Sequence, residues 1–455
     1  MTIKLSNYRD SVCSLIEGRE LLWFGVRGSD ATAIDGNVDL KHCFSVLAPL
    51  NKSRVSELCL ESELKHRIEH NYSDIDNDNS REASYFRINT KKIILEKLQK
   101  KSLTIVPYRP SRFLTSIYFP IQHQFQYLGN FFEFQQCFEH KPWVETCLSK
   151  EGIRTIGWEY LSDGYFHRCE SMFDRDKRKF VLRANRGAGG TGLVLINSKE
   201  DLVKAELKHG DGFLGIAPYL EPNIPININA CVTCDGKVIV HPASFQLIGI
   251  NSCINLKFGY CGNDFAAIKN LKTRIINRIE NITKRAGKWL YNMGFLGAFG
   301  LDLIYYNDYL LVTEINPRFQ CSTPIAALIS KELGLPDLYM DHMAAFLGVQ
   351  CSLKRPPLVE ITRQQTPIAQ VICNNKKPFI VYRCCKEEYH CPKGFEIECL
   401  PELNVDVEEG AMLFKLICSD AVTEDGKSLF KDVRVLIDSI TNHYFSINTP
   451  ILPGI

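Results

Sequence analysis

The chain lacks a long apolar run. None of its 455 residues belongs to a segment approaching the roughly 18 apolar residues that span a bilayer, and its first residues, MTIKLSNYRDSV, are mixed and polar, unlike a secretory signal. It also lacks an excess of one charge, since 54 basic residues face 52 acidic ones and the net charge is +2. These absences argue against a membrane or nucleic-acid partner and predict a cytoplasmic protein with a local site.

Cysteine, in contrast, is abundant. The 18 cysteines belong to a chain whose 45% hydrophobic content is enough to build a core without disulfides, so we expect free thiols in a reducing compartment. Cys231 and Cys234 have the spacing of half a zinc site, but no second Cys or His pair stands at zinc-ribbon distance. The sequence therefore does not predict a structural zinc ion.

The character of the sequence changes along the chain. The apolar runs 21–27 and 43–49 predict buried strands of an α/β opening section. A helix is predicted from about 264 to 292, and two strands that follow it are joined by Asn307-Asp308, a good hairpin-turn pair. Beyond about residue 350 the chain is rich in predicted strands and turn signals, which favours a separate β-rich part.

The most informative pattern lies at residues 302 to 318. Asp302 stands in the predicted strand FGLDLIYY, and Glu314 and Asn316 stand in the next one, YLLVTEIN. Because side chains alternate along a strand, Glu314, Asn316 and Arg318 point the same way. A hairpin would bring Asp302 beside them. Two carboxylates and an amide oxygen are ligands suited to Mg²⁺, and Arg318 can offer a planar fork to phosphate. The alternative is a hairpin face in solvent.

A glycine-rich stretch lies between two predicted strands, at 179–184 and 193–197. It reads RANRGAGGTG from Arg183 to Gly192, with a second arginine at Arg186. Glycines let a backbone approach phosphate with its N–H groups, although a flexible surface hairpin has the same composition. One predicted strand precedes this stretch and another follows it, so it is not the strand-to-helix turn of a Walker loop.

The order of these segments resembles the ATP-grasp superfamily, which includes D-alanine–D-alanine ligase, biotin carboxylase and amino-acid and peptide ligases. A basic residue precedes a glycine-rich hairpin, an apolar hinge strand follows, and then come Asp and Glu-x-Asn-x-Arg in a second hairpin. The stretches that carry the resemblance are FEHKPWVETCLSKEGIRT, FVLRANRGAGGTGLVLI, IAPYLEP and GAFGLDLIYYNDYLLVTEINPR. They cover about residues 139 to 345.

The resemblance implies an α/β (α+β) chain with the ATP-grasp fold. A Rossmann-like lobe is expected at 1–138 and a two-lobed nucleotide clamp at 139–350. Within the clamp, the lid would occupy 139–220 and the metal-binding part 221–350. A small C-terminal β-rich lobe is expected at 351–455.

The resemblance also assigns roles to residues of the metal and phosphate site. ATP and two Mg²⁺ ions, with Mn²⁺ as an alternative, are the implied cofactors. Asp302 and Glu314 would be metal carboxylates, with Glu314 bridging the two ions, and Asn316 would be a ligand of the second ion. Arg318 would hold the transferring phosphoryl group or the acyl phosphate. Arg183 stands where the family usually has a lysine on the α-phosphate, and both arginines are predicted to be catalytic.

Further residues are assigned to the nucleotide. Lys141 resembles a phosphate-contacting lysine, and Tyr219 and Leu220 would offer backbone groups at the adenine hinge. Asn227, or Asn229 in its place, would substitute for the missing ribose-contacting acid. The lid over the triphosphate would comprise Gly187, Gly189, Gly190, Thr191 and Gly192.

One position departs from the family pattern at the adenine site. Ala217 stands where many members have a glutamate that accepts from the adenine amino group. Backbone carbonyls could serve instead.

The predicted substrate residues are Gln246, Asn263 and Arg318. Gln246 and Asn263 lie on the strand and loop expected beside the acceptor or donor pocket, and amide side chains can orient an amino acid. His241 is the nearby histidine with the potential of a base, although a strand histidine without a catalytic role is the alternative.

The implied function is an ATP-dependent ligase that activates a carboxylate as an acyl phosphate and couples it to an amine. Amino acids or peptides are the expected substrates, in specialised metabolite biosynthesis. Alternatives are loading of an amino acid onto a carrier-protein thiol and a non-catalytic ATP-binding sensor or scaffold. Carboxylation of a bicarbonate-type substrate is a further alternative, for which no pocket is identified. Pairing of the N-terminal lobe into a homodimer is left open.

Overall fold

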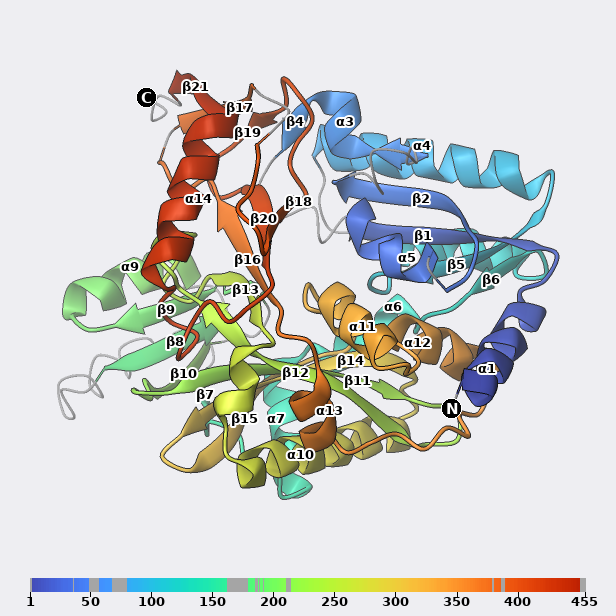
Figure 1. Ribbon diagram of the computed structural model, residues 1–455, viewed down its shortest axis with the longest axis horizontal. Coiled ribbons are helices and arrows are strands. Elements are labelled where there is room, and N and C mark those ends of the chain that lie inside the picture. The colour runs from blue at the N-terminus through green and yellow to red at the C-terminus, as the bar shows by residue number, and fades with distance from the viewer. Residues whose placement is uncertain are drawn as a thin grey trace.

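A computed structural model gives the arrangement of the chain (Figure 1). It describes residues 2–35, 37–48, 57–67, 80–161, 179–184, 187, 189–190, 192–209, 214–378, 380–385 and 389–450. None of the described helices is long and apolar enough to cross a membrane.

The N-terminal part is a five-stranded sheet in the order β3-β2-β1-β5-β6, and its strand pairs are parallel. Strands β1 and β2 are buried almost throughout, as expected for a sheet covered on both faces. The strands are β1 (Arg19–Arg27), β2 (Leu40–Leu47), β3 (Leu58–Cys59), β5 (Ser102–Pro107) and β6 (Phe125–Tyr127). The helices are α1 (Thr2–Leu15), α2 (Thr32–Asp35), α3 (Leu60–Leu64), α4 (Arg81–Leu98) and α5 (Arg112–Tyr118). An α/β opening section was predicted and is confirmed.

A small antiparallel sheet in the order β7-β10-β8-β9 carries the glycine-rich stretch. Strands β8 and β9 pair antiparallel, with Arg183 opposite Leu193, so the predicted hairpin is confirmed. The elements of this part are α6 (Phe132–Phe138), α7 (Lys141–Lys150), β7 (Glu159–Leu161), β8 (Phe180–Ala184), β9 (Leu193–Ile196), α9 (Lys199–His209) and β10 (Leu214–Pro218). Figure 1 shows this sheet and α9 to one side of the large sheet that follows.

The large sheet has eight strands in the order β15-β14-β11-β12-β13-β16-β20-β18. Helix α10 packs its apolar face, which includes Ile275, Ile279 and Leu290, on one side of it, and α11 and α12 cover part of the other side (Figure 1). The strands are β11 (Ile224–Val232), β12 (Val238–Ile248), β13 (Tyr260–Asp264), β14 (Gly297–Tyr306), β15 (Tyr309–Asn316), β16 (Ala369–Asn374), β18 (Phe395–Glu398) and β20 (Met412–Cys418). The helices are α10 (Thr273–Asn292), α11 (Thr323–Glu332), α12 (Leu338–Leu347) and α13 (Leu358–Gln364).

The C-terminal strands divide between two sheets. Strands β16, β20 and β18 extend the large sheet. A further four-stranded sheet, in the order β21-β17-β19-β4, takes one strand from the N-terminal part. Its members are β4 (His66–Arg67), β17 (Ile380–Cys384), β19 (Asp406–Val407) and β21 (Phe445–Pro450), and α14 (Lys431–Tyr444) lies beside it. The domain boundaries at 138 and 350 stay predictions.

The hairpin of β14 and β15 forms as predicted. Asn307 and Asp308 have φ values of 45° and 63°, the left-handed conformations that a tight hairpin turn requires and that these residue types tolerate. The ladder places Asp302 opposite Glu314 and Gly300 opposite Asn316. The predicted side-by-side arrangement of the two carboxylates is therefore confirmed.

The helix predicted from about 264 begins later, at Thr273. Residues 260–264 instead form β13 in the interior of the large sheet, with Asn263 paired to Gln246. The short polar sequence YCGND gives no strand signal on its own, and neighbouring strands determine its conformation. Position 262 of this strand requires glycine, because its φ is +124° and a Cβ there would lie 2.1 Å from the carbonyl oxygen of Gln370.

Gly262→Ala is expected to lower the free energy of unfolding by more than about 2 kcal/mol, because both the backbone conformation and the close strand resist a side chain. Urea denaturation measures the change. Gly334→Ala is the matched control: its φ is +67° but no atom lies within 4 Å of the added Cβ, so only the cost of about 1 kcal/mol for the conformation remains. Equal losses in the two variants would contradict this account of β13.

A candidate nucleotide and metal site on the large sheet

Asp302 lies at the centre of a cluster of amide side chains. Its Oδ1 accepts hydrogen bonds from Asn227 Nδ2 at 2.6 Å and Gln246 Nε2 at 3.0 Å, and its Oδ2 accepts one from Asn316 Nδ2 at 3.0 Å. These donors come from β11, β12 and β15, which the sheet brings to one face. Burial and the negative charge of Glu314 raise the pKa of Asp302 to about 6, although the three amide donors act in the opposite direction.

A second layer of polar residues holds Asn227 in place. Asn227 Nδ2 also donates to Gln320 Oε1 at 3.0 Å, and its Oδ1 accepts from the hydroxyl of Ser322 at 2.7 Å. Ser322 in turn accepts from Asn229. Asn227 is 2% exposed. The residue predicted for the ribose thus contacts the Asp302 carboxylate, and its role toward the nucleotide stays a prediction.

Glu314 meets a lysine from another part of the chain. Its Oε1 lies 2.9 Å from Nζ of Lys141, the first residue of α7. Lys141 also donates to the carbonyl oxygen of Gly187 in the glycine-rich stretch, at 3.2 Å. The lysine therefore connects the predicted metal carboxylate to the predicted lid.

Arg318 and Asn316 follow one another on this face. The guanidinium of Arg318 donates to Asn316 Oδ1 at 3.2 Å and to the carbonyl oxygen of Phe319 at 3.1 Å. It also lies 5.9 Å from the ring centroid of Tyr108, which follows the carboxyl end of β5 in the N-terminal sheet. Crevices at the carboxyl ends of parallel strands are common ligand sites, so Arg318 stands between the large sheet and such an end.

Arg183 is held by several partners. Its guanidinium donates to the carbonyl oxygen of Thr313 at 3.0 Å, to Glu145 and to the hydroxyl of Tyr160. It also stacks 4.0 Å from the ring centroid of Trp158. Burial raises the pKa of Glu145, while Arg183 counteracts that effect. These contacts hold the guanidinium of Arg183 beside Thr313, the residue that precedes Glu314. The contact of Arg183 with phosphate stays a prediction.

The predicted lid and hinge lie close to each other. Gly190 has a φ of +87°, and a Cβ there would lie 2.0 Å from the carbonyl oxygen of Phe258. The backbone N–H of Tyr260 donates to the carbonyl oxygen of Gly189 at 3.3 Å. Tyr219 packs edge-on against Phe258 with centroids 6.1 Å apart, and Leu220 beside it is half-buried. Gly187 and Gly192 belong to the same stretch, whereas Thr191 and Arg186 lie outside the described residues.

Two of the predicted substrate residues, Gln246 and Asn263, belong to a polar band on β12, β13 and β16, whereas Arg318 follows β15. Asn263 Nδ2 donates to Ser244 Oγ at 2.9 Å, and its Oδ1 accepts from the hydroxyl of Tyr260 and, at 3.3 Å, from Gln370. Asn263 is fully buried. Gln246, its partner in the ladder, reaches Asp302 instead, so this band adjoins the metal face.

His241 lies apart from this band. It is fully buried, with Nε2 3.0 Å from Asp341 and Nδ1 3.5 Å from the hydroxyl of Ser330. Burial lowers its pKa. These contacts support the reading of His241 as a structural residue.

Part of the chain matches a known protein family. Residues 167–322 match the protein-family model for the ATP-grasp domain. The chain therefore contains an ATP-grasp domain. The arginine-specific carbamoyl phosphate synthase large chain of Halalkalibacterium halodurans is 24% identical over 186 residues. That alignment covers 38% of this chain and 16% of the relative.

Solved structures show the same fold over nearly the whole chain. Biotin carboxylase from Campylobacter jejuni, in complex with an ATP analogue, superposes with a TM-score of 0.60 and 14% identity over 96% of this chain and 93% of that one. The N5-carboxyaminoimidazole synthetase of Staphylococcus aureus, complexed with ADP, gives 0.54 and 12% over 93% and 96%. The predicted superfamily and the predicted fold class are confirmed, and the matches support the prediction of an ATP-dependent enzyme.

Sequence reasoning missed several residues of the candidate site. Gln320 and Ser322 follow Arg318 directly and could have been suspected from their place after the motif. Glu145 stands four residues after Lys141, on the same side of α7. Tyr108 gives no such signal, because only the tertiary fold brings it to Arg318.

The raised pKa of Asp302 makes stability depend on pH. Its ordinary value is about 3.9, so between about pH 4 and 6 the unfolded chain loses this proton while the folded, metal-free chain retains it. The free energy of unfolding therefore falls as pH rises through this window. Relative to Asp302→Asn, the wild type should lose about 1–2 kcal/mol between pH 4.5 and 7.

Urea titrations with a chelator present measure this difference at each pH. Subtracting the profile of Asp302→Asn removes the contribution of every other titrating group. Parallel profiles for the two proteins would show that Asp302 titrates normally and would contradict the described environment.

Proposed function

We propose that the chain is an ATP-dependent ligase that phosphorylates a carboxylate and couples the resulting acyl group to an amine. The observation that carries this proposal is the pairing of Asp302 with Glu314 in one hairpin, next to Asn316 and Lys141. Hard oxygen ligands and a lysine on one face of the sheet suit the binding of a nucleoside triphosphate with its divalent ions.

The donor set fits magnesium. Asp302 and Glu314 bring two carboxylates together, and Asn316 adds an amide oxygen on the same strand as Glu314. Burial and the charge of Glu314 raise the pKa of Asp302, and a cation placed between the two carboxylates would relieve their mutual repulsion. Bound Mg²⁺ would supply charge neutralisation at the phosphate oxygens there. Two ions, with Mn²⁺ as a substitute, remain part of the proposal.

The neighbouring cations complete the charge balance of phosphoryl transfer. A substrate carboxylate and the γ-phosphate repel each other, and positively charged groups lower that barrier. Lys141 is placed to shift from Glu314 to a phosphate, since its Nζ already lies between that carboxylate and the carbonyl of Gly187. Arg318 can present its fork to the transferred phosphoryl group, and Arg183 supports the strand that carries Glu314.

The acyl phosphate must then be protected from water until the amine arrives. The glycine-rich stretch lies against Phe258 and Tyr260, so it is positioned to cover the triphosphate. An amide-lined band with Gln246 and Asn263 adjoins the metal face. Uncharged amides of this kind suit the ammonium and carboxylate of an amino acid, which we propose as a substrate class.

The assay for this function is ADP release from Mg·ATP in the presence of single amino acids and of amino-acid pairs. Release that needs one amino acid, or rises when a second is added, is the expected result. ATP binding without release for any pair would contradict the amino-acid assignment. It would point instead to a carrier-protein thiol as acceptor or to a non-catalytic ATP-binding protein.

Glu314→Gln is expected to lower turnover by at least about 10³-fold, because it removes a negative charge from the metal site while leaving the strand intact. The rate of ADP release under saturating ATP measures the effect. Glu332→Gln is the control, since this glutamate ends α11 away from the cluster, and its rate should equal that of the wild type. A Glu314→Gln protein with full ATP-dependent activity would overturn the assignment.

A further inference from the structure

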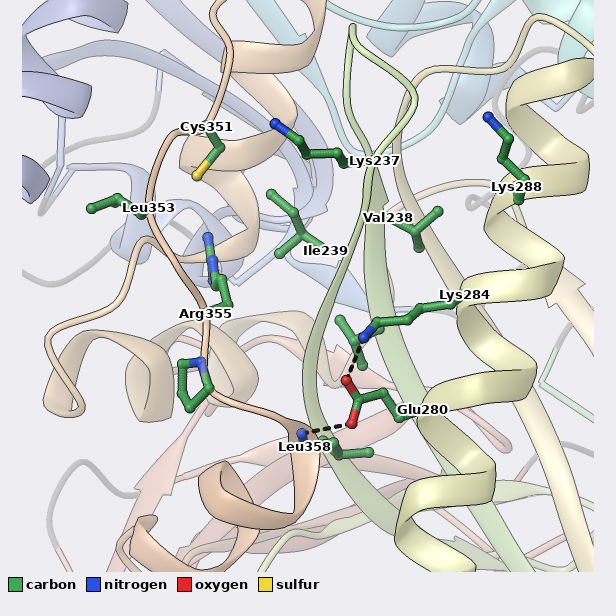
Figure 2. A pocket seen from close by; sticks show the side chains of 12 residues that line it. Lys237, Val238, Ile239, Glu280, Lys284, Lys288, Cys351, Leu353, Arg355 and Leu358 are labelled. Carbon is green, nitrogen blue, oxygen red and sulfur yellow. Dashed lines mark hydrogen bonds and ion pairs between the residues drawn. The ribbon is translucent and has the colours of Figure 1, made fainter.

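A second pocket lies at the other end of β12. Its volume is about 440 Å³, and Figure 2 shows the strand running between helix α10 on one side and the segment 351–358 on the other. The pocket begins at Lys237, nine positions before Gln246 in the chain. At about 3.3 Å per residue, roughly 20–30 Å separate the two ends, so this pocket is separate from the nucleotide site.

The charged residues of the pocket are mostly positive. Lys237 enters from the start of β12, Lys284 and Lys288 from α10, and Arg355 from the opposite wall. Glu280 is the one carboxylate among the lining residues. Lys237, Lys284 and Lys288 are exposed, so each side chain can turn toward a ligand, although Lys237 and Lys284 would then leave the carboxylates of Asp235 and Glu280.

Lys237 pairs with Asp235 at 2.7 Å, and Lys284 pairs with Glu280. Glu280 is shared, because its Oε1 accepts from Lys284 at 2.6 Å and its Oε2 accepts from the backbone N–H of Leu358 at 2.9 Å. Lys288 lies 4.7 Å from the ring centroid of Tyr291 rather than beside a carboxylate in the described part of the chain. Lys284 and Lys288 are four residues apart on one helix face, where like charges repel. An anion between them would relieve that repulsion.

Arg355 adds an unused hydrogen-bond donor. One terminal nitrogen bonds to the carboxylate of Asp341 and the other to the carbonyl oxygen of Pro336 at 2.8 Å. Its Nε is buried and has no acceptor within the ranges that the structure describes. A buried N–H without an acceptor is costly. The arginine is thus held in the wall with part of its hydrogen-bonding capacity unmet.

The rest of the pocket surface is apolar. The other lining residues are Val238, Ile239, Val240, Cys351, Leu353, Pro356 and Leu358. We propose that this pocket binds a small amphiphilic anion, with a phosphate or carboxylate headgroup among the lysines and an apolar body along β12. A volume of this size is typical of sites for small metabolites.

The test is direct binding by isothermal titration calorimetry, with Mg²⁺ and a non-hydrolysable ATP analogue present so that the nucleotide site is occupied. Phenyl phosphate and phenylacetate are the two probes, and comparing them distinguishes a phosphate from a carboxylate headgroup. We expect one saturable site per chain for at least one probe. Because the readout is binding, it does not depend on whether the chain is a ligase.

Two variants should change the affinity in opposite directions. Lys284→Gln combined with Lys288→Gln should weaken binding by about tenfold, at roughly 0.5–1 kcal/mol per exposed charge. Glu280→Gln keeps an acceptor for Leu358 but removes the negative charge, so it should tighten binding by about threefold or more. Lys331→Gln, at an exposed lysine of α11 outside the pocket, should leave the affinity unchanged.

Absence of saturable binding for both probes would overturn the proposal. So would equal affinities in the wild type, the double lysine variant and Glu280→Gln, because the anion would then bind elsewhere. Circular dichroism of each variant checks that α10 is intact, so a loss of binding can be attributed to charge.

Discussion

Asp302 and Glu314 lie opposite each other in the hairpin of β14 and β15, so two carboxylates are close together. The other residues of the candidate site surround this pair. Three amide donors surround Asp302 and a lysine faces Glu314. Neutral amides orient a carboxylate without cancelling its charge, whereas Lys141 offsets the charge of Glu314. Burial and the charge of Glu314 together raise the pKa of Asp302, so this pKa reports both the buried position and the neighbouring carboxylate.

The parts of the fold meet at this hairpin. Helix α7 supplies Lys141, the small sheet supplies Arg183, and the N-terminal sheet brings Tyr108 to Arg318. Lys141 contacts both a predicted metal carboxylate and the glycine-rich stretch, so under the proposed function one side chain would couple occupation of the phosphate site to the position of the lid. The proposed function would therefore draw on side chains from separate sheets of the chain.

The local features of the site were predictable and the tertiary ones were not. Strand alternation and the Asn307-Asp308 turn predicted the register of Asp302 and Glu314, because a hairpin is determined by neighbouring residues. The strand Tyr260–Asp264 was missed, since its conformation depends on strands paired with it from far along the chain. The contacts between Arg183 and Glu145 likewise join segments 38 positions apart, which no local pattern reveals.

The most direct test is a crystal structure with Mn²⁺ and a non-hydrolysable ATP analogue, in which anomalous scattering locates the metal. We expect metal peaks within about 2.0–2.3 Å of the carboxylate oxygens of Asp302 and Glu314, with Lys141 moved from Glu314 to a phosphate. Nucleotide bound without metal at these two carboxylates, or bound elsewhere in the chain, would contradict the assignment of this face as the site of phosphoryl transfer.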